Sequence, residues 1–181
     1  MKNFYRLAEN VPVNALMTAI HTQPDLWNKN TLRTEHPDSP HTQADDIWLR
    51  FNKLEGDVTK VVDDQESICY PAWHMLPQAQ PIIFDLMRLV NGVRLGRVLI
   101  TRLRPGKGID PHVDGGEHAK YYKRFHVMLQ NQAGSLFYCE DEVVCMKPGE
   151  VWFFRNDLTH SVKNNSGDDR ITMIIDIAVL C

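Results

Sequence analysis

Much of the second half of the chain consists of short strand-like apolar runs, and residues 124–130 alternate between polar and apolar positions as strands with one buried face do. Such runs, separated by turn-forming residues, cover residues 93–103, 124–130, 135–140, 143–146, 151–154 and 171–179. The third and fourth runs read as a hairpin around Asp141 and Glu142. Short strands with turns between them favour a sandwich or barrel, so we predict an antiparallel β core here.

The first half has a different pattern, in which apolar residues recur at helical spacing. This spacing predicts one helix between Asn10 and Trp27 and a second over residues 77–91, with Gly92 as its stop. Residues 47–51 form an apolar run that reads as a strand. Residues 28–46 are polar and rich in turn formers, which is typical of a loop that is either disordered or closes over a site as a lid.

The length of 181 residues corresponds to about one domain. No flexible linker divides the chain, so we expect a single domain over residues 1–181. Within it, residues 1–93 are expected to supply helices, loops and early strands, and residues 94–181 the β core. The expected fold class is mainly β with flanking helices.

Composition narrows the classes of function without naming one. Lys and Arg total 20 against 23 Asp and Glu, a formal net charge of −3, so no broad positive surface for nucleic acid is indicated. The four cysteines form no CxxC pair, and no apolar segment approaches the roughly 20 residues that span a bilayer. The N-terminus lacks the apolar region of a signal peptide, so we expect a cytoplasmic protein with reduced thiols and no membrane partner. The sequence leaves the oligomeric state open.

The most specific chemical pattern is His112-Val113-Asp114, which two glycines follow. In an extended segment residues i and i+2 point to the same side, so this imidazole and this carboxylate can meet one cation. His160 is the best candidate for a third ligand. Two histidines and one carboxylate form the facial triad of non-haem Fe(II) oxygenases, which leaves coordination positions open. Each residue alone is typical of an ordinary surface position, so the prediction rests on their combination.

Arg170 opens an apolar run and shares a face with Thr172, opposite four apolar residues of the same run. An arginine that enters a core strand needs an anionic partner, because an unpaired buried charge is very costly. A dicarboxylate co-substrate would supply that partner in the bidentate geometry that arginine prefers. An ion pair with Asp168 or Asp169 is the structural alternative.

Arg124 and His126 repeat this arrangement on another predicted strand, where Phe125, Val127 and Leu129 point the other way. The apolar set suits a core. The face with the arginine and the histidine then looks either to solvent or into a polar cavity near the metal.

The order of these motifs resembles that of the Fe(II)/2-oxoglutarate-dependent dioxygenases, and most of all the aspartyl/asparaginyl β-hydroxylase family, which includes small proline hydroxylases and phage-borne members. The resemblance runs from His112-x-Asp114 through Arg124-x-His126 and Pro148-Gly149-Glu150 to His160, with Arg170 ten residues later. It covers about residues 94–181 and implies a double-stranded β-helix, the cupin-like jelly roll, with helices packed outside.

The resemblance implies that Fe(II) is bound by His112, Asp114 and His160. It implies that Arg170 pairs with the distal carboxylate of 2-oxoglutarate and that Arg124 and His126 lie beside either this co-substrate or the substrate. With O₂, the implied activity is hydroxylation of a C–H bond in an amino acid, either free or as an Asp, Asn or Pro residue of a peptide. Because Asp114 is present, a full triad is available, which favours hydroxylation over halogenation.

Arg50 and Arg102 are further candidates to contact an anionic substrate, although solvent exposure is the more ordinary position for such residues. Two other classes of function remain open at this stage. One is a zinc or other divalent-metal isomerase or hydrolase of the cupin type, which would use the same ligands but would not need Arg170. The other is a non-enzymatic jelly-roll binding protein, which would need neither the triad nor Arg170.

Overall fold

The computed structural model describes residues 2–36, 38–54 and 61–180. The helices are α1 (Asn14–His21), the 3₁₀ helix η1 (Pro24–Leu26), α2 (Leu32–Glu35), α3 (Pro71–Met75), α4 (Ala79–Leu89) and α5 (Gly116–Tyr121). The strands are β1 (Phe4–Ala8), β2 (Asp45–Phe51), β3 (Ile68–Cys69), β4 (Gly92–Leu103), β5 (Gly108–His112), β6 (Lys123–Gln130), β7 (Ser135–Cys139), β8 (Glu142–Val144), β9 (Val151–Phe154), β10 (His160–Asn164) and β11 (Arg170–Val179).

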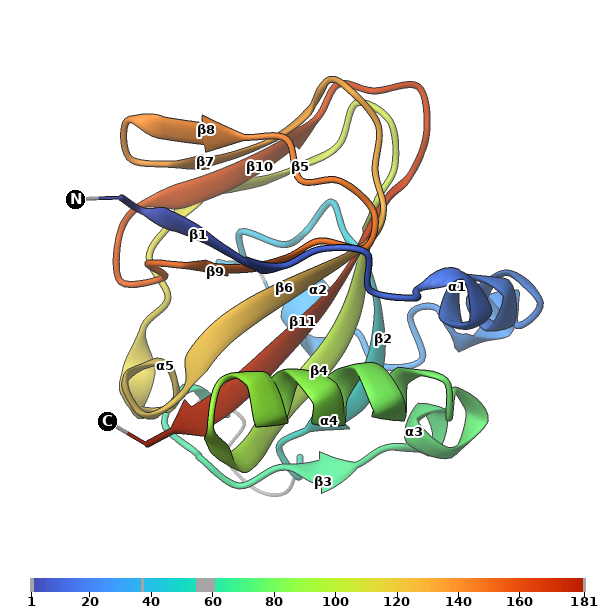
Figure 1. Cartoon of the computed structure of the whole chain (residues 1–181), viewed down its shortest axis with the longest axis vertical. Helices are drawn as coiled ribbons and strands as arrows, with labels where there is room; N and C mark the ends of the chain where they lie inside the picture. The colour runs from blue at the N-terminus through green and yellow to red at the C-terminus, as the bar shows by residue number, and fades with distance from the viewer. Residues whose placement is uncertain (1, 37, 55–60, 181) are drawn as a thin grey trace.

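Two antiparallel sheets face each other (Figure 1). The large sheet has the strand order β1-β9-β6-β11-β4-β2-β3, and the small sheet has the order β5-β10-β7-β8. Together they form the predicted double-stranded β-helix. Strands from the first half of the chain contribute to the large sheet, because β1 pairs with β9 and β2 pairs with β4.

The outer face of the large sheet is the face turned away from the small sheet, and helices α1, α3 and α4 cover it (Figure 1). The apolar residues of the alternating runs gather here, as the sequence pattern predicted. The largest hydrophobic cluster joins these helices to alternate residues of three central strands, namely Val98, Ile100, Phe125, Val127, Leu129, Ile171, Met173, Ile175 and Ile177. Burial of this apolar area is the main source of stability for the sheet.

The inner face is the face of the large sheet turned toward the small sheet. A second apolar cluster fills one part of the space between the sheets, with Leu103, Met128 and Phe154 from the large sheet and Phe137 and Val162 from the small sheet. Leu99 and Ile174 belong to a third, smaller apolar cluster on this face, and many of the other inner-face positions are polar. Buried there are Arg170, Thr172, Asp176, His126 and Asp46. The same strands therefore carry apolar side chains outward and charged side chains inward.

The predicted elements are found with some changes of boundary. The helix predicted between Asn10 and Trp27 is divided into α1 and η1, because Pro24 begins a separate 3₁₀ turn. The second helix ends before Gly92, which already belongs to β4; Asn91 takes the left-handed conformation after the helix, with a φ of 53°. The loop predicted over 28–46 contains α2 and the start of β2.

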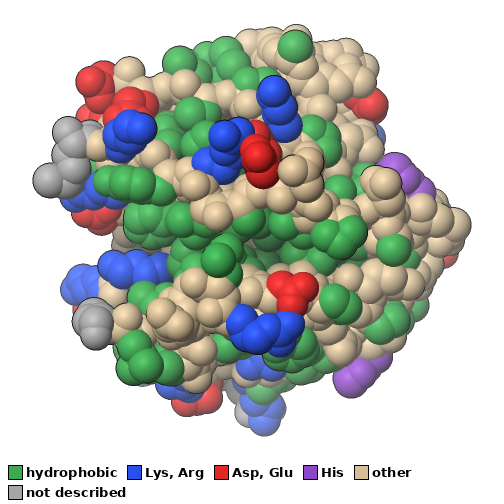
Figure 2. Space-filling view, in the orientation of Figure 1, with side chains coloured by type: hydrophobic (Ala, Val, Ile, Leu, Met, Phe, Trp, Pro, Cys, Tyr) green, Lys and Arg blue, Asp and Glu red, His purple; other side chains and the backbone are tan. Residues whose placement is uncertain are grey.

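In the orientation of Figure 1, hydrophobic side chains gather across the middle of the surface, with charged side chains above and below them (Figure 2). Tyr5 and Leu7 of β1 are among the large hydrophobic side chains that are exposed. None of the helices in the described part of the chain has the length and apolar character needed to cross a bilayer.

Candidate active site

Three side chains converge where the two sheets meet, and we call them the ligand cluster: His112, Asp114 and His160. His112 ends β5 and His160 begins β10, and the two residues are direct partners in the antiparallel register. Asp114 follows in the turn after β5. One ligand atom of each residue lies within 4.8 Å of the others. Asp114 Oδ1 is 3.6 Å from His112 Nε2 and 3.9 Å from His160 Nε2.

The strand backbone fixes the orientation of both imidazoles. His112 Nδ1 donates to the Asp110 carbonyl at 2.8 Å, and His160 Nδ1 donates to the Leu158 carbonyl at 2.9 Å. Because each Nδ1 carries the proton, each Nε2 presents a lone pair to the space beside Asp114. Burial lowers the pKa of His160 to about 4, so this imidazole is neutral at pH 7 and able to bind a metal.

The carboxylate of Asp114 is held in its charged form. Burial alone would raise its pKa, but Arg124 and the two neighbouring imidazoles hold the pKa well below its usual range. Arg124 Nη1 donates to Oδ2 at 2.8 Å and Asn156 Nδ2 donates to the same oxygen at 3.2 Å. These two bonds leave Oδ1 directed at the histidines.

Arg124 connects the ligand cluster to a buried chain of charges. It makes a two-bond ion pair with Asp176 of β11, at 2.9 and 3.0 Å. Asp176 also accepts from His118 Nε2 at 3.0 Å, and His118 Nδ1 donates to the Asp64 carbonyl at 2.9 Å. The guanidinium of Arg124 is therefore occupied by two carboxylates, and it orients Asp114 from behind.

Asp176, His118 and Asn156 were not identified from the sequence. The alternation that placed Arg170 and Thr172 on one face of β11 also places Asp176 there, and this was an available signal. His118 and Asn156 carried no such signal, because they reach the site from a short helix and a turn whose positions depend on the tertiary fold.

Arg170 lies on the inner face of β11, and its side chain is almost completely buried. Its Nη2 has no hydrogen-bond partner, and among the described residues it forms no ion pair. The two acidic residues that were the structural alternative make other contacts: Asp168 accepts from Gln132, and Asp169 lies 3.8 Å from Arg102. Burial lowers the pKa of Arg170 to about 10, so at pH 7 it is a buried cation with no ion-pair partner in the described part of the chain.

His126 is buried near both Arg170 and the ligand cluster. Its ring lies 5.2 Å from the ring of Phe137 and 5.0 Å from that of Phe154, and the guanidinium carbon of Arg170 is 5.9 Å from the Phe137 ring. Burial, followed by the two arginines nearby, holds the pKa of His126 well below its usual value, so the imidazole is neutral. Its Nδ1 has no hydrogen-bond partner among the residues that the structure describes.

The unpartnered buried atoms test whether this site fits a metal and an anionic co-substrate. Such atoms are rare in folded proteins, and each calls for an explanation. Three of them, His112 Nε2, His126 Nδ1 and Arg170 Nη2, belong to the predicted site. A cation in the ligand cluster would satisfy the first, and a carboxylate against Arg170 would satisfy the third. The residues present therefore fit Fe(II) together with 2-oxoglutarate.

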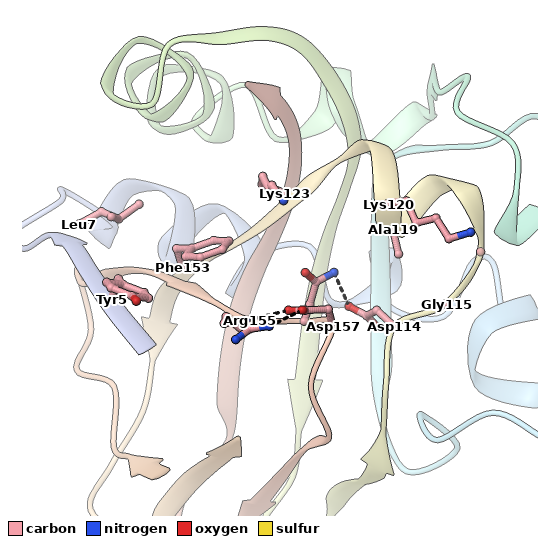
Figure 3. A pocket seen from close by; sticks show the side chains of 12 residues that line it. Tyr5, Leu7, Asp114, Gly115, Ala119, Lys120, Lys123, Phe153, Arg155 and Asp157 are labelled. Carbon is pink, nitrogen blue, oxygen red and sulfur yellow. Dashed lines mark hydrogen bonds and ion pairs between the residues drawn. The ribbon is translucent and has the colours of Figure 1, made fainter. Parts of the chain in front are cut away.

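Two cavities adjoin Asp114 on different sides. One, of about 640 Å³, lies between β1, β9 and α5 and is lined by Tyr5, Phe153, Lys120 and Lys123 (Figure 3). The other, of about 550 Å³, is lined by both His112 and Asp114. We call this second space the His112 cavity. Two of the three residues of the ligand cluster border this cavity, whereas only Asp114 borders the other one.

The loop over residues 28–46 forms part of the wall of the His112 cavity. Arg33 pairs with Asp46 at 2.6 Å and donates to His41 Nδ1 at 3.1 Å. The His41 ring lies 5.1 Å from the ring of His112. Burial, followed by Arg33 and His112, holds the pKa of His41 well below its usual value. Its neutral ring accepts from Arg33 and therefore carries its proton on Nε2.

The two arginines suggested for substrate binding lie elsewhere. Arg102 pairs with Asp45 at 2.8 Å and stacks over Trp27 at 4.4 Å. Arg50 donates to the carbonyls of Gly96 and Ser67. Neither arginine is among the described residues that line the His112 cavity. Substrate binding by these two residues stays a prediction.

Comparison with known proteins agrees with this geometry. Residues 20–179 match the family described as aspartyl/asparaginyl beta-hydroxylase. L-proline cis-3-hydroxylase 1 from Streptomyces sp is 28% identical over 133 residues, which is 71% of this chain and 45% of that protein. This chain therefore spans less than half the length of the curated relative that it matches.

Solved structures with the same fold cover nearly the whole chain. An oxidoreductase of the 2OG-Fe(II) oxygenase family from Burkholderia pseudomallei superposes with a TM-score of 0.62 at 10% identity, over 97% of this chain and 84% of that one. The viral collagen prolyl hydroxylase from Paramecium Bursaria Chlorella virus-1, in complex with 2OG, gives a TM-score of 0.55 at 13% identity, over 99% and 97%. These similarities support the jelly-roll assignment of the fold.

Proposed function

Because the chain belongs to the aspartyl/asparaginyl β-hydroxylase family, we propose that it is an Fe(II)- and 2-oxoglutarate-dependent dioxygenase that hydroxylates a C–H bond of an amino-acid-like substrate. One observation carries the proposal: a two-histidine, one-carboxylate cluster and a buried arginine without an anion share the space between the sheets. A zinc isomerase would have no use for Arg170, whereas a 2-oxoglutarate enzyme requires such a cation.

In this proposal the ligand cluster holds Fe(II), and the backbone carbonyls of Asp110 and Leu158 keep the two imidazoles in the tautomer that binds metal. Arg170 binds the distal carboxylate of 2-oxoglutarate. When bound, iron and 2-oxoglutarate supply the oxidising chemistry, with O₂ consumed and succinate and CO₂ released. Arg124 acts through Asp114, which it orients, and the contacts give it no free edge for the co-substrate.

The role of His126 differs from that of Arg124, which lies on the same strand, β6. Its neutral ring and unpartnered Nδ1 lie beside the buried arginine, next to Phe137. We propose that it contacts the co-substrate, while the substrate enters from the His112 cavity. The wall formed by residues 28–46 then limits the access of water to the metal, as active-site lids do.

The proposal is tested by measuring succinate formation from 2-oxoglutarate with Fe(II), O₂ and a panel of free proline and Asp- or Asn-containing peptides. Asp114→Ala and His112→Ala are expected to abolish turnover while the protein stays folded. The exposed His74 of α3 provides the matched control, and His74→Ala is expected to retain wild-type rates. Turnover that survives removal of metal by a chelator would contradict the proposal.

An anaerobic spectrum separates this function from a zinc enzyme. The wild-type protein with Fe(II) and 2-oxoglutarate is expected to give a weak visible charge-transfer band, and Asp114→Ala is expected to lose it. Absence of the band in the wild type, combined with tight zinc binding, would favour the isomerase or hydrolase class instead.

Arg170→Ala is expected to raise the 2-oxoglutarate requirement strongly, because the carboxylate loses a buried charge-assisted partner. Loss of such a pair costs about 2–5 kcal/mol, or roughly 30-fold to several thousand-fold in affinity. The KM for 2-oxoglutarate is the measurement, with the exposed Arg88 of α4 as the control position. An unchanged KM would mean that Arg170 is only structural.

A further inference from the structure

Another arginine, the half-buried Arg97 of β4, faces the His112 cavity. Side chains alternate along a strand, and Val98 and Ile100 belong to the outer apolar cluster. Arg97 and Leu99 therefore lie on the inner face, and both line the cavity together with His112 and Asp114. The cavity thus has a metal site at one wall and a guanidinium at another.

The guanidinium of Arg97 is held in place by contacts on one side. Its Nε donates to Asn52 Oδ1 at 2.6 Å, its Nη2 donates to the Val61 carbonyl at 2.5 Å, and its Cζ lies over the Phe51 ring, 4.6 Å from the ring centroid. A guanidinium has five N–H groups. Both hydrogens of Nη1 and one of Nη2 remain without a hydrogen bond among the described residues, and these groups form the edge that binds a carboxylate with two parallel bonds.

Arg97 also differs from the other arginines of this cavity in its charge balance. Arg33 pairs with Asp46, and Arg124 pairs with Asp114 and Asp176. Arg97 has neutral partners only, and no carboxylate of a described residue lies within ion-pair distance of it. Burial lowers its pKa to about 10, so it is charged at pH 7. A fixed cation that forms no ion pair with a described residue therefore borders the same cavity as His112 and Asp114, and Asp176 and Asp64 act on its charge from beyond ion-pair distance.

The co-substrate cannot be the anion that Arg97 lacks if Arg170 binds the same molecule. Arg170 pairs with Leu103 in the register of β4 and β11, and Arg97 lies six positions earlier on β4. At about 3.3 Å per residue, this separates the two positions by about 20 Å, which is far longer than a five-carbon dicarboxylate. The two arginines therefore serve different anions.

We propose that Arg97 binds a carboxylate of the substrate and so selects carboxylate-bearing substrates for the metal centre. This inference rests on the proposed function, since it names the substrate chemistry of the same site. The carboxylate has two possible sources: the α-carboxylate of a free amino acid, or the side chain of an acidic residue in a peptide. Both would form the same bidentate pair with the guanidinium, beside the apolar surface of Leu99 and Phe51.

Equilibrium binding tests the proposal independently of turnover. Calorimetry under argon, with and without Fe(II) and 2-oxoglutarate, compares two matched pairs of probes. L-proline and L-prolinamide differ in the α-carboxylate, and acetyl-aspartate amide and acetyl-asparagine amide differ in the side-chain carboxylate. We expect the wild type to bind the carboxylate of at least one pair more tightly than its amide, and the pair that shows this difference identifies the source.

The variants Arg97→Met and Arg97→Lys then assign the effect to the guanidinium. Arg97→Met is expected to weaken binding of the carboxylate probe roughly 30-fold to 1,000-fold and to remove the preference over the amide, with Arg97→Lys in between. Arg88→Met is the control for an exposed arginine. The KM for 2-oxoglutarate and the melting temperature check that the change is confined to the substrate.

Several outcomes would overturn the assignment. In the wild type, these are equal binding of acid and amide in both pairs, or no binding of any probe. In Arg97→Met, they are an unchanged affinity for the carboxylate probe, or a changed KM for 2-oxoglutarate in place of a changed substrate affinity. Failure of the proposed function has a different signature. In that case the wild type forms no succinate, yet it still binds the carboxylate probe in a manner that depends on Arg97.

Discussion

The two faces of the large sheet are made by the same strands but are stabilised in different ways. The outer face packs apolar side chains under α1, α3 and α4, where any side chain of similar shape contributes through burial. The inner face holds buried charges. Arg124 is stabilised there by Asp114 and Asp176, whereas Arg170 has no ion-pair partner among the described residues. The outer face therefore determines whether the chain folds, and the inner face determines what the folded chain can bind.

The largest expected effect on stability comes from breaking the chain of charges on the inner face. Arg124→Met leaves Asp114 and Asp176 buried without their common cation, and removal of one partner of such a pair costs about 3–5 kcal/mol. Urea unfolding measures the loss, and metal titration is expected to show weaker binding by the ligand cluster. Arg155→Met provides the control, because its pair with Asp157 is more exposed. An equal loss in both variants would contradict the distinction between inner and outer positions.

The outer face is tested by a cavity-forming substitution. Ile175 of β11 is completely buried under the helices, and Ile175→Ala is expected to cost about 2–5 kcal/mol of unfolding free energy. Below its melting temperature this variant is expected to keep the wild-type KM for 2-oxoglutarate. A large rise in that KM would mean that the two faces are coupled more closely than their packing indicates.

A smaller effect concerns pH and the carboxylate of Asp176. Burial alone would raise its pKa, but Arg124 and His118 hold the pKa well below its usual value. A depressed pKa stabilises the folded state above the unfolded pKa of about 4, and this stabilisation is lost as the pH falls below that value. Asp176→Asn lacks this contribution, so its stability deficit at pH 7 is expected to narrow on acidification, by up to about 1.4 kcal/mol per pH unit. Urea unfolding from pH 7 to pH 3 measures it, and a constant deficit would contradict the assignment.

The smallest effect is expected at Arg102, which alternation places on the outer side of β4 with Val98 and Ile100. Arg102→Met removes its pair with Asp45 and is expected to cost about 1 kcal/mol of stability. The KM for substrate is expected to stay at the wild-type value, in contrast to Arg97→Met. A rise in that KM would restore Arg102 as a substrate residue.

Local pattern was sufficient to predict the central strands and the outer core. The alternation in 124–130 and 171–179 identified both faces, and the HxD motif with His160 identified a cluster that the fold brings within 4.8 Å. Short strands were missed: β5 contains Gly108 and Pro111, and β10 is largely polar, so neither has a β signal of its own. Their partners in the small sheet stabilise them, and this tertiary contribution has no local signature.

The sequence was also insufficient to predict which arginine lines the His112 cavity. Charge alone selected Arg50 and Arg102, because they are basic residues on predicted strands. Leu99, Thr101 and Leu103 lie on the inner face of β4, and the alternation of side chains along the strand places Arg97 on the same face. Arg124 and Asp176 are direct partners in the register of β6 and β11, and this pairing between strands that are far apart in sequence has no local signature.

The direct pairing of His112 with His160 across β5 and β10 has a consequence for folding. A slip of one residue between these strands would turn one imidazole to the opposite side of the sheet, because side chains alternate. Under the proposed metal binding, only the correctly aligned chain would offer both nitrogens together with Asp114. A bound ion would act as a reversible cross-link between two distant parts of the chain and penalise every misaligned arrangement.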